Sequence, residues 1–600
     1  MLPNIIFFSF LVAFLNKLSS ATEFPNLRTR QNATQPNIVF ILTDDQDLQM
    51  DSMNYLPLIK KHLSDQGMFY SQHYCTVAVC CPSRVNLWTG RAAHNTNVTD
   101  LVPPYGGYPK FISQGLNDNY LPVWLQQAGY NTYYVGKLFN SHSTENYNQP
   151  FPAGFTGSEF LLDPYTYQYY NPGFQRNKDP PVVYPGNYST DLVAQKAFGF
   201  LDDAVNSGSP FFLAIAPIAP HANVNVTFNA NGTSTVLTSG PMPAIKYQSL
   251  FPDAVVPRTK NFNPDTPSGA GWVRQLPQLS EPDVERNDEW YRNRLRALQS
   301  VDEMVDQLMA RLEQYNLLDN TYIFYTTDNG YHVGQHRLQP GKSCGYEEDI
   351  NVPLVVRGPG IARNMTTDIV TSHTDLAPTI LKIFGIPMRE EFDGSAIPLT
   401  PEDISEIATG REHVNVEFWG NRYNPEDGNA YVYTDGVVSL VNNTYKAIRL
   451  IGQGYNLYYS VWCSHDHELY DMDADPHQME NLFPLGFTKN STLASWTANE
   501  TILGVSTLNL ASRLDALMFV LKSCQGDECR EPWAALQPDG NVSNLKEALQ
   551  PKFDNFYQNQ VPRVQFSRCE PGHIIDAEGP QFEPNVIYSD GGDPQWAIWT

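Results

Sequence analysis

Short apolar runs alternate with longer amphipathic stretches through the first two thirds of the chain. The runs are rich in β-branched and aromatic residues, as the buried strands of an α/β sheet are. They cover residues 37–43, 130–135, 211–217, 321–327 and 352–357. Between them, residues 120–129, 191–206 and 288–312 have the composition and the apolar spacing of helices. The alternation predicts an α/β fold with a large sheet flanked by helices.

The pattern changes beyond residue 387, where the predicted strands become shorter. They cover residues 414–418, 432–440 and 444–450, and a helix is predicted at residues 501–522. This indicates a smaller antiparallel domain. The expected division of the chain is therefore residues 1–21, 22–387, 388–531 and an irregular extension at 532–600.

Two long stretches of the larger domain lack clear periodicity. Residues 140–190 are rich in Tyr, Asn, Gly and Pro, and we expect them to form an insertion that walls a cleft. Residues 224–280 are expected to be loops.

The first 21 residues predict a cleaved signal peptide. An apolar run at residues 5–15 precedes small residues at positions 19–21, and it is too short to span a bilayer comfortably. Ten Asn-x-Ser/Thr sequons agree with a secretory route. We therefore expect an N-glycosylated protein in a secreted or lysosomal-like compartment, without a membrane anchor. A net charge of −25 argues against nucleic acid as a partner.

Acidic and amide side chains follow two of the predicted strands. Asp44 and Asp45 come directly after the first strand, and Asp328 and Asn329 follow the strand at residues 321–327. Open α/β sheets bind their ligands at the carboxyl ends of the strands. These four side chains give the all-oxygen set that is typical of Ca²⁺ or Mg²⁺.

Three basic side chains are placed near the same sheet edge. Lys137 follows the strand at residues 130–135, His221 follows the strand at 211–217, and Lys342 precedes the strand at 352–357. Each residue alone would be an ordinary surface lysine or structural histidine. Their shared place with the acidic residues makes them candidate site residues.

Residues 80–91 predict a helix whose N-terminus carries Cys80. Pro82 suits the first turn of a helix and Gly90 suits its end. Free N–H groups and the helix dipole make this N-terminus an anion site, and Arg84 adds a permanent positive charge. The spacing from Cys80 to Arg84 does not fit a tyrosine-phosphatase loop, and no second Cys pair follows to bind zinc.

The order Cys-x-Pro-Ser-Arg from Cys80, followed by Thr-Gly-Arg, resembles the sulfatase signature, in which the first cysteine is oxidised to formylglycine. Further blocks resemble the family at residues 37–39, 44–45, 136–137, 220–221, 328–330, 342–347, 469–471 and 475–476. The likeness is greatest to N-acetylglucosamine-6-sulfatase and secreted arylsulfatases, through residues 260–263, 320–325, 328–332 and 522–524. The resemblance implies an alkaline-phosphatase-like fold, with a large mixed sheet between helices and a small C-terminal antiparallel sheet.

The resemblance also implies a calcium-dependent sulfate-ester hydrolase, with Mg²⁺ as the alternative ion. It assigns metal binding to Asp44, Asp45, Cys80, Asp328 and Asn329, and catalysis to Cys80, Arg84, Lys137, His221 and Lys342. Arg84 and Lys137 would steady the hydrated aldehyde, while His221 and Lys342 would meet the bridging oxygen or the sulfate. The implied partners are a sulfate ester and a formylglycine-generating enzyme.

One position departs from the family pattern. Many sulfatases have His two residues after the lysine of the Gly-Lys block, where this chain has Phe139. The base for the second hydroxyl is therefore open among His94, Asn140 and His142. His465 and His467 alternate on one face and could bind a metal, but a surface or core role is favoured for them.

The cysteines predict one small disulfide loop, between Cys524 and Cys529. Conversion of Cys80 would leave seven of the eight cysteines, so at least one thiol is expected to stay unpaired within the chain.

The favoured function is that of a secreted arylsulfatase, and the second is that of an N-acetylglucosamine-6-sulfatase acting on sulfated glycans. Hydrolysis of phosphodiesters or phosphonates is less favoured, and so is glycan binding without catalysis. The presence of every expected site residue except the histidine at position 139 argues against an inactive protein.

Overall fold

Strand β1 (Asn37–Thr43) lies inside a ten-stranded sheet, and all of its residues are buried. Its neighbours β8 (Phe211–Ala216) and β11 (Thr321–Thr327) run parallel to it. The sequence predicted these three strands. The computed structural model describes residues 35–228, 234–407, 411–420, 430–433, 436–439, 442–483, 501–537 and 541–583, so the predicted signal peptide lies outside the described residues.

The sheet is mixed, with the strand order β13-β2-β12-β11-β1-β8-β4-β5-β6-β7. Its other strands are β2 (Met68–Tyr70), β4 (Asn131–Gly136), β5 (Gly157–Leu161), β6 (Gly173–Arg176), β7 (Val182–Val183), β12 (Leu354–Arg357) and β13 (Met365–Thr367). Residues 140–190 therefore include strands of the sheet, because β5, β6 and β7 extend its edge. The expectation that residues 140–190 form only an insertion beside a cleft was therefore incomplete, because it missed these edge strands. Strands this short, separated by turns rich in Pro and Gly, leave little periodicity in the sequence.

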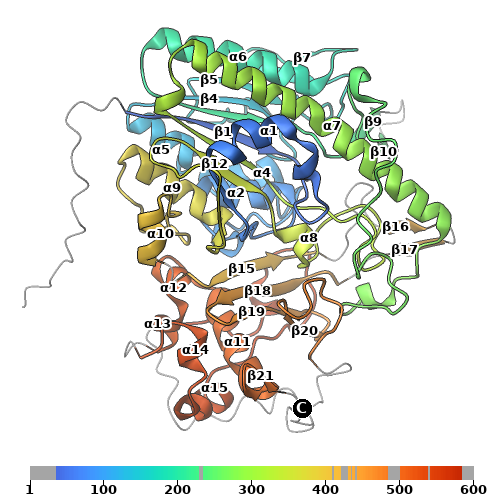
Figure 1. The fold of residues 1–600 in the computed structure, drawn as a ribbon, viewed down its shortest axis with the longest axis vertical. Coiled ribbons are helices and arrows are strands. Elements are labelled where there is room, and N and C mark those ends of the chain that lie inside the picture. The colour runs from blue at the N-terminus through green and yellow to red at the C-terminus, as the bar shows by residue number, and fades with distance from the viewer. Residues whose placement is uncertain are drawn as a thin grey trace, which may run out of the picture. The chain divides into compact units, whose positions relative to one another are not determined.

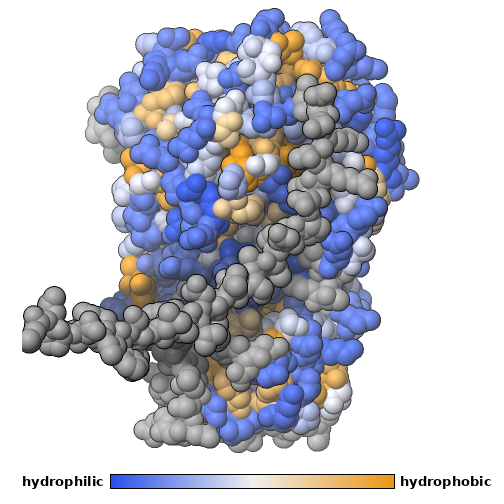
Figure 2. Space-filling model, turned by 90° about the vertical axis from the view of Figure 1, so that its left-hand side faces the viewer, coloured by the Kyte–Doolittle hydropathy of each residue, from blue (hydrophilic) through white to orange (hydrophobic). Residues whose placement is uncertain are grey.

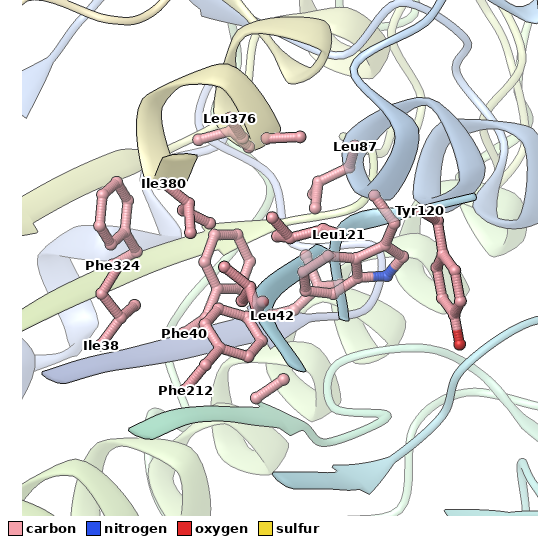
Figure 3. Packing of buried hydrophobic residues seen from close by; sticks show 14 of the residues in the cluster. Ile38, Phe40, Leu42, Leu87, Tyr120, Leu121, Phe212, Phe324, Leu376 and Ile380 are labelled. Atoms are coloured by element: carbon pink, nitrogen blue, oxygen red, sulfur yellow. The ribbon is translucent and has the colours of Figure 1, made fainter. Parts of the chain in front are cut away.

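Helices cover both faces of this sheet, because successive side chains of a strand point to opposite sides. Ile38, Phe40 and Leu42 face one helical layer (Figure 3), and Val39 and Ile41 face the other. The first layer is formed by α2 (Cys80–Thr89), α4 (Gly107–Ser113), α5 (Leu121–Gln127) and α9 (Leu376–Phe384). The second layer is formed by α1 (Pro57–His62), α6 (Ser189–Ser207) and α7 (Glu281–Gln314), as Figure 1 shows for α6 and α7.

Two stretches differ from the expected secondary structure. The expected loops at residues 224–280 contain a hairpin of β9 (Asn223–Phe228) and β10 (Ser234–Ser239). The alternation of polar residues with Val224 and Val226 was the available signal for this hairpin. Helix α7 begins seven residues earlier than predicted, because Ser280 and Asp283 form a capping box ahead of its apolar stripe.

A second, antiparallel sheet follows in the C-terminal part of the chain. Its strands are β15 (His413–Phe418), β18 (Tyr445–Gly452), β19 (Tyr455–Trp462) and β20 (His467–Asp471), in that order. One face packs on α11 (Thr507–Leu521), which begins later than predicted, after β21 (Thr501–Ile502) and β22 (Val505–Ser506). The strand predicted at residues 432–440 is a hairpin of β16 (Ala430–Tyr433) and β17 (Gly436–Ser439).

The stretch expected to be irregular after residue 531 contains helices. They are α13 (Pro532–Leu536), α14 (Leu545–Ala548) and α15 (Asp554–Asn559). The shorter elements elsewhere are β3 (His73–Tyr74), β14 (Thr371–Ser372), α3 (Ala93–Thr96), α8 (Glu347–Ile350), α10 (Pro401–Ile407) and α12 (Asp527–Arg530). Residues 36–600 form one unit that contains both sheets, and the division at residue 387 stays a prediction.

The expected Cys524–Cys529 disulfide is present, and a second disulfide joins Cys463 to Cys569. The other four cysteines are free and buried, which agrees with the expectation of an unpaired thiol.

The face of the molecule in Figure 2 is mainly hydrophilic, with hydrophobic residues in small groups. Among the described residues, no helix has the length and apolar character needed to cross a membrane.

Candidate active site

The carboxyl ends of β1 and β11 bring the four predicted oxygen ligands together. Thr43 pairs with Thr327, so the two following dipeptides, Asp44-Asp45 and Asp328-Asn329, are neighbours. The Asp45 backbone N–H donates to Asp328 Oδ1 at 3.1 Å, and Asn329 Nδ2 donates to Asp45 Oδ1 at 2.7 Å. All four side chains are fully buried.

Helix α2 places Cys80 beside these carboxylates. Cys80 is the first residue of the helix, and Gly90 ends it in the left-handed conformation, with φ of 66°. The Cys80 thiol is 3.5 Å from Asp44 Oδ1 and 3.8 Å from Asp45 Oδ1. The predicted helix thus brings the signature cysteine to the carboxyl end of β1.

Three cations interleave with the carboxylates. Arg84 Nε donates to Asp328 Oδ2 at 2.7 Å, and Lys137 Nζ donates to Asp44 Oδ2 at 2.7 Å. Lys342 Nζ contacts Asp45 Oδ1 and lies 2.9 Å from the sulfur of residue 80. The predicted site residues Arg84, Lys137 and Lys342 therefore lie in one buried charge network with the three carboxylates.

The network perturbs the pKa of its members. Burial alone would raise the pKa of Asp44, but the charges of Lys137, His221 and Arg84 outweigh it and lower the pKa to about 2. Burial raises the pKa of the Cys80 thiol well above its usual range, and the nearby lysines only partly oppose this effect. The unmodified thiol is therefore protonated at neutral pH, which disfavours a thiolate nucleophile.

His221 faces the site through its Nε2 atom, which lies 3.6 Å from Asp45 Oδ2. Its Nδ1 atom lies 2.9 Å from the carbonyl oxygen of Ala222 and donates to it. This bond fixes the tautomer and leaves Nε2 for exchange of a proton with a ligand.

The site fits a hard divalent cation. Asp45 Oδ2 and Asn329 Oδ1 are buried and have no hydrogen-bond partner. Ligand atoms of Asp44, Asp45, Cys80 and His221 lie within 4.8 Å of one another. Because buried polar atoms are normally paired, the two orphaned oxygens are candidate ligand atoms of a cation such as Ca²⁺.

A neighbouring group of His332, Cys344 and Asp349 could also hold a metal by composition. Here Asp349 Oδ1 already accepts from His332 Nδ1 at 2.8 Å, and Asp349 Oδ2 accepts from the Cys344 backbone N–H at 2.8 Å. Both carboxylate oxygens are thus occupied. The group fastens the loop that carries Lys342, a role that the sequence did not indicate.

Neither His94 nor His142, two of the three candidate bases, belongs to the group of potential ligand atoms around Cys80. His94 is bonded to Glu417 at 2.8 Å and to the Cys524 carbonyl oxygen at 2.8 Å. The His142 ring packs against Tyr108 with centroids 4.3 Å apart, and burial lowers the pKa of His142 to about 3. Asn140 remains, and its Nδ2 donates to Tyr167 Oη at 2.6 Å.

Two residues at the site were missed by sequence reasoning. Arg294 of α7 donates to the carbonyl oxygen of Asp45 and to Asp47 Oδ1. Tyr167 stacks on the His221 ring. Nothing in the local sequence distinguishes either residue.

His467 packs against Phe483 with ring centroids 4.7 Å apart, in keeping with the favoured core role.

The family model described as Sulfatase matches residues 36–386, more than half of the chain. The chain belongs to the sulfatase family. A second family model, described as the C-terminal part of N-sulphoglucosamine sulphohydrolase, matches residues 334–493 of this sulfatase. The expected family, fold class and sulfuric ester hydrolase activity are confirmed by these matches and by the following relatives.

An arylsulfatase of Volvox carteri is 39% identical over 580 residues, which cover 92% of this sulfatase and 84% of the relative. N-acetylglucosamine-6-sulfatase of Capra hircus is 32% identical over 528 residues, or 84% and 86% of the two chains. A solved structure in complex with its substrate D-glucosamine-2-N,6-O-disulfate has a TM-score of 0.59 at 22% identity and covers 75% of this chain and 94% of its own. At that identity the likeness concerns the fold alone.

Proposed function

We propose that this sulfatase hydrolyses sulfate esters through a formylglycine made from Cys80 and one bound Ca²⁺. The observation that carries the proposal is the position of Cys80, 3.5 Å from Asp44 at a helix N-terminus, beside two orphaned ligand oxygens. Mg²⁺ is the alternative ion, because its preference for oxygen ligands is the same.

The charge of the site supports both the cation and an anionic substrate. Its carboxylates, Asp44, Asp45 and Asp328, are matched in number by its cations, Arg84, Lys137 and Lys342. A divalent ion would therefore leave an excess of positive charge in a fully buried site. This local excess would attract a sulfate monoester despite the net charge of −25 on the whole chain.

A formylglycine at position 80 would supply the nucleophile for sulfur, and a metal held by Asp44, Asp45, Asp328 and Asn329 would stabilise the charge on the sulfate oxygens. Lys342, 2.9 Å from the residue 80 side chain, would orient that side chain and balance the charge on the sulfate. Arg84 and Lys137 hold Asp328 and Asp44 in place. His221 would donate a proton from Nε2 to the leaving alcohol.

The proposed substrate is an aryl sulfate, with a 6-sulfated aminosugar of a glycan as the alternative. The names of the two relatives support these two classes.

We further propose secretion and N-glycosylation. The sequon residues Asn187, Asn225, Asn364 and Asn541 are exposed, so the described surface would accommodate glycans there. A formylglycine-generating enzyme is the proposed partner in maturation.

Mass spectrometry of the tryptic peptide that contains Cys80 tests the proposal. We expect a mass lower than that of the cysteine peptide by the difference between cysteine and formylglycine. Cys80→Ala should abolish turnover, whereas the matched variant Cys81→Ala should be tolerated. An unmodified thiol in a fully active preparation would overturn the mechanism. Faster turnover of phosphate diesters or phosphonates than of sulfate esters would overturn the substrate class.

A further inference from the structure

Tyr167 touches three side chains of the active site at once. Its ring stacks on the His221 imidazole, with centroids 4.1 Å apart and an interplanar angle of 21°. Lys137 Nζ lies 4.9 Å from the centroid of the same ring. Its hydroxyl accepts a hydrogen bond from Asn140 Nδ2 at 2.6 Å. A single aromatic side chain thus contacts the proposed acid, a cation of the charge network and the residue after Phe139.

The backbone around Tyr167 is also tied to the segment that follows His221. The Val224 N–H donates to the Tyr167 carbonyl oxygen at 3.1 Å. Two residues on, Tyr169 Oη donates to the His221 carbonyl oxygen at 2.8 Å. The stacked geometry is therefore built from both sides, since bonds to the backbone and to Asn140 define where the ring lies.

The residue at position 139 bears on why the orientation of the His221 ring matters. Phe139 is buried in the core, with its ring centroid 4.6 Å from that of Phe111, and it carries no group that exchanges protons. His94 is hydrogen-bonded elsewhere and His142 packs against Tyr108. Among the described residues, His221 is the one histidine in the group of potential ligands around Cys80, whose ligand atoms lie within 4.8 Å of one another. The orientation of this single ring then controls proton donation at the site.

We infer that Tyr167 is a positioning residue, which holds the His221 ring so that Nε2 meets the oxygen of the leaving group. The inference rests on the proposed function, because His221 acts there as the acid. As the S–O bond breaks, its electron pair stays on the alcohol oxygen, and that oxygen takes the proton from Nε2 of the imidazolium. Loss of the ring would let the imidazole turn away, and a misplacement of about 1 Å costs about 100-fold in rate.

The inference predicts an effect that grows as the leaving group becomes poorer. 4-Nitrophenolate is a good leaving group and departs readily without being protonated. Phenolate is a poorer leaving group, so its departure depends more strongly on proton donation. Tyr167→Leu should therefore lower kcat for phenyl sulfate about 10- to 100-fold and kcat for 4-nitrophenyl sulfate by about threefold or less. KM should change little for either ester. Tyr167→Phe keeps the stacked ring and should restore most of the rate on phenyl sulfate.

The experiment measures kcat and KM of the mature, metal-loaded enzyme on a series of aryl sulfates. Tyr170→Leu is the matched control, because Tyr170 lies in the same stretch and its ring packs on Tyr188. Equal slowing of good and poor leaving groups in Tyr167→Leu would overturn the inference. If that variant does not fold, Tyr167→Met removes the ring at similar volume and is judged in the same way.

His221→Ala separates the inference from the proposed function. A stronger dependence on the leaving group in His221→Ala but not in Tyr167→Leu would refute only the positioning role. If neither variant depends more strongly on the leaving group than the wild type does, His221 is not the acid. A second readout is the rate at which diethyl pyrocarbonate modifies His221, followed by mass spectrometry. This rate should rise in Tyr167→Leu, since the stacked ring no longer covers the imidazole, and an unchanged rate would contradict the inference.

Discussion

Glu417→Gln should destabilise the protein without slowing catalysis. Glu417 lies on β15 and is fully buried. It accepts from His94 Nδ1 at 2.8 Å and from Lys446 Nζ at 2.8 Å, so it joins α3 to two strands of the small sheet. The substitution keeps the shape of the side chain and removes its charge.

The magnitude follows from the pKa of Glu417. Burial alone would raise this pKa, but His94 and Lys446 outweigh burial and lower it from 4.5 to about 2. A lowering of about 2.5 pH units corresponds to about 3 kcal/mol of stability. Breaking a buried ion pair by removing one partner costs a similar amount, about 3–5 kcal/mol. We therefore expect the free energy of unfolding to fall by about 3 kcal/mol at pH 7.

The pH dependence gives the sign of the effect. The lowered pKa of Glu417 contributes stability that is complete above pH 4.5 and is lost as the pH falls towards about 2. The pKa of His94 is raised, because Glu417 outweighs its burial. Its contribution is complete below the ordinary value of 6.5 and is lost as the pH rises through the raised value. The difference in the free energy of unfolding between the wild type and Glu417→Gln should therefore be largest between pH 4.5 and pH 6.5. It should shrink at lower pH, as Glu417 is protonated, and at higher pH, as His94 loses its proton.

The assay is urea unfolding of the metal-loaded enzyme at pH 3, 5 and 7, with turnover of 4-nitrophenyl sulfate measured in parallel. Glu285→Gln on the exposed side of α7 is the matched control, and we expect a change within about 0.5 kcal/mol. An unchanged urea midpoint in Glu417→Gln would refute the argument from burial. A large loss of kcat in the folded variant would instead return His94 to the catalytic candidates.

Further predictions concern the metal and the loop that carries Lys342. Chelation should abolish turnover, and Ca²⁺ should restore it; unaffected turnover would remove the metal proposal. Asp328→Asn should weaken Ca²⁺ binding, measured by calorimetry on the metal-free enzyme, because it removes one charged ligand; unchanged affinity would contradict the ligand set. Asp349→Asn should lower kcat about 10-fold or more through misplacement of Lys342. Wild-type kcat in this variant would show that the clamp on the loop is not needed.

The central part of the site was predictable because it depends on local signals with a shared geometry. A buried strand shows itself by its composition, and polar residues that end parallel strands meet at one sheet edge. The pairing of Thr43 with Thr327 is an instance of this rule. The helix that begins at Cys80 was predictable in the same way from Pro82 and Gly90.

The sequence alone therefore determined the family, the α/β architecture and the residues that meet at the ends of β1 and β11. The tertiary structure decided against His94 as a base, since His94 is paired with a residue more than 300 positions away. It also decided the roles of Tyr167 and Arg294, which ordinary-looking segments bring to the site. The physical reason is that these contacts join side chains far apart in the chain, and only the packing of the layers fixes which distant groups share one buried, charged space.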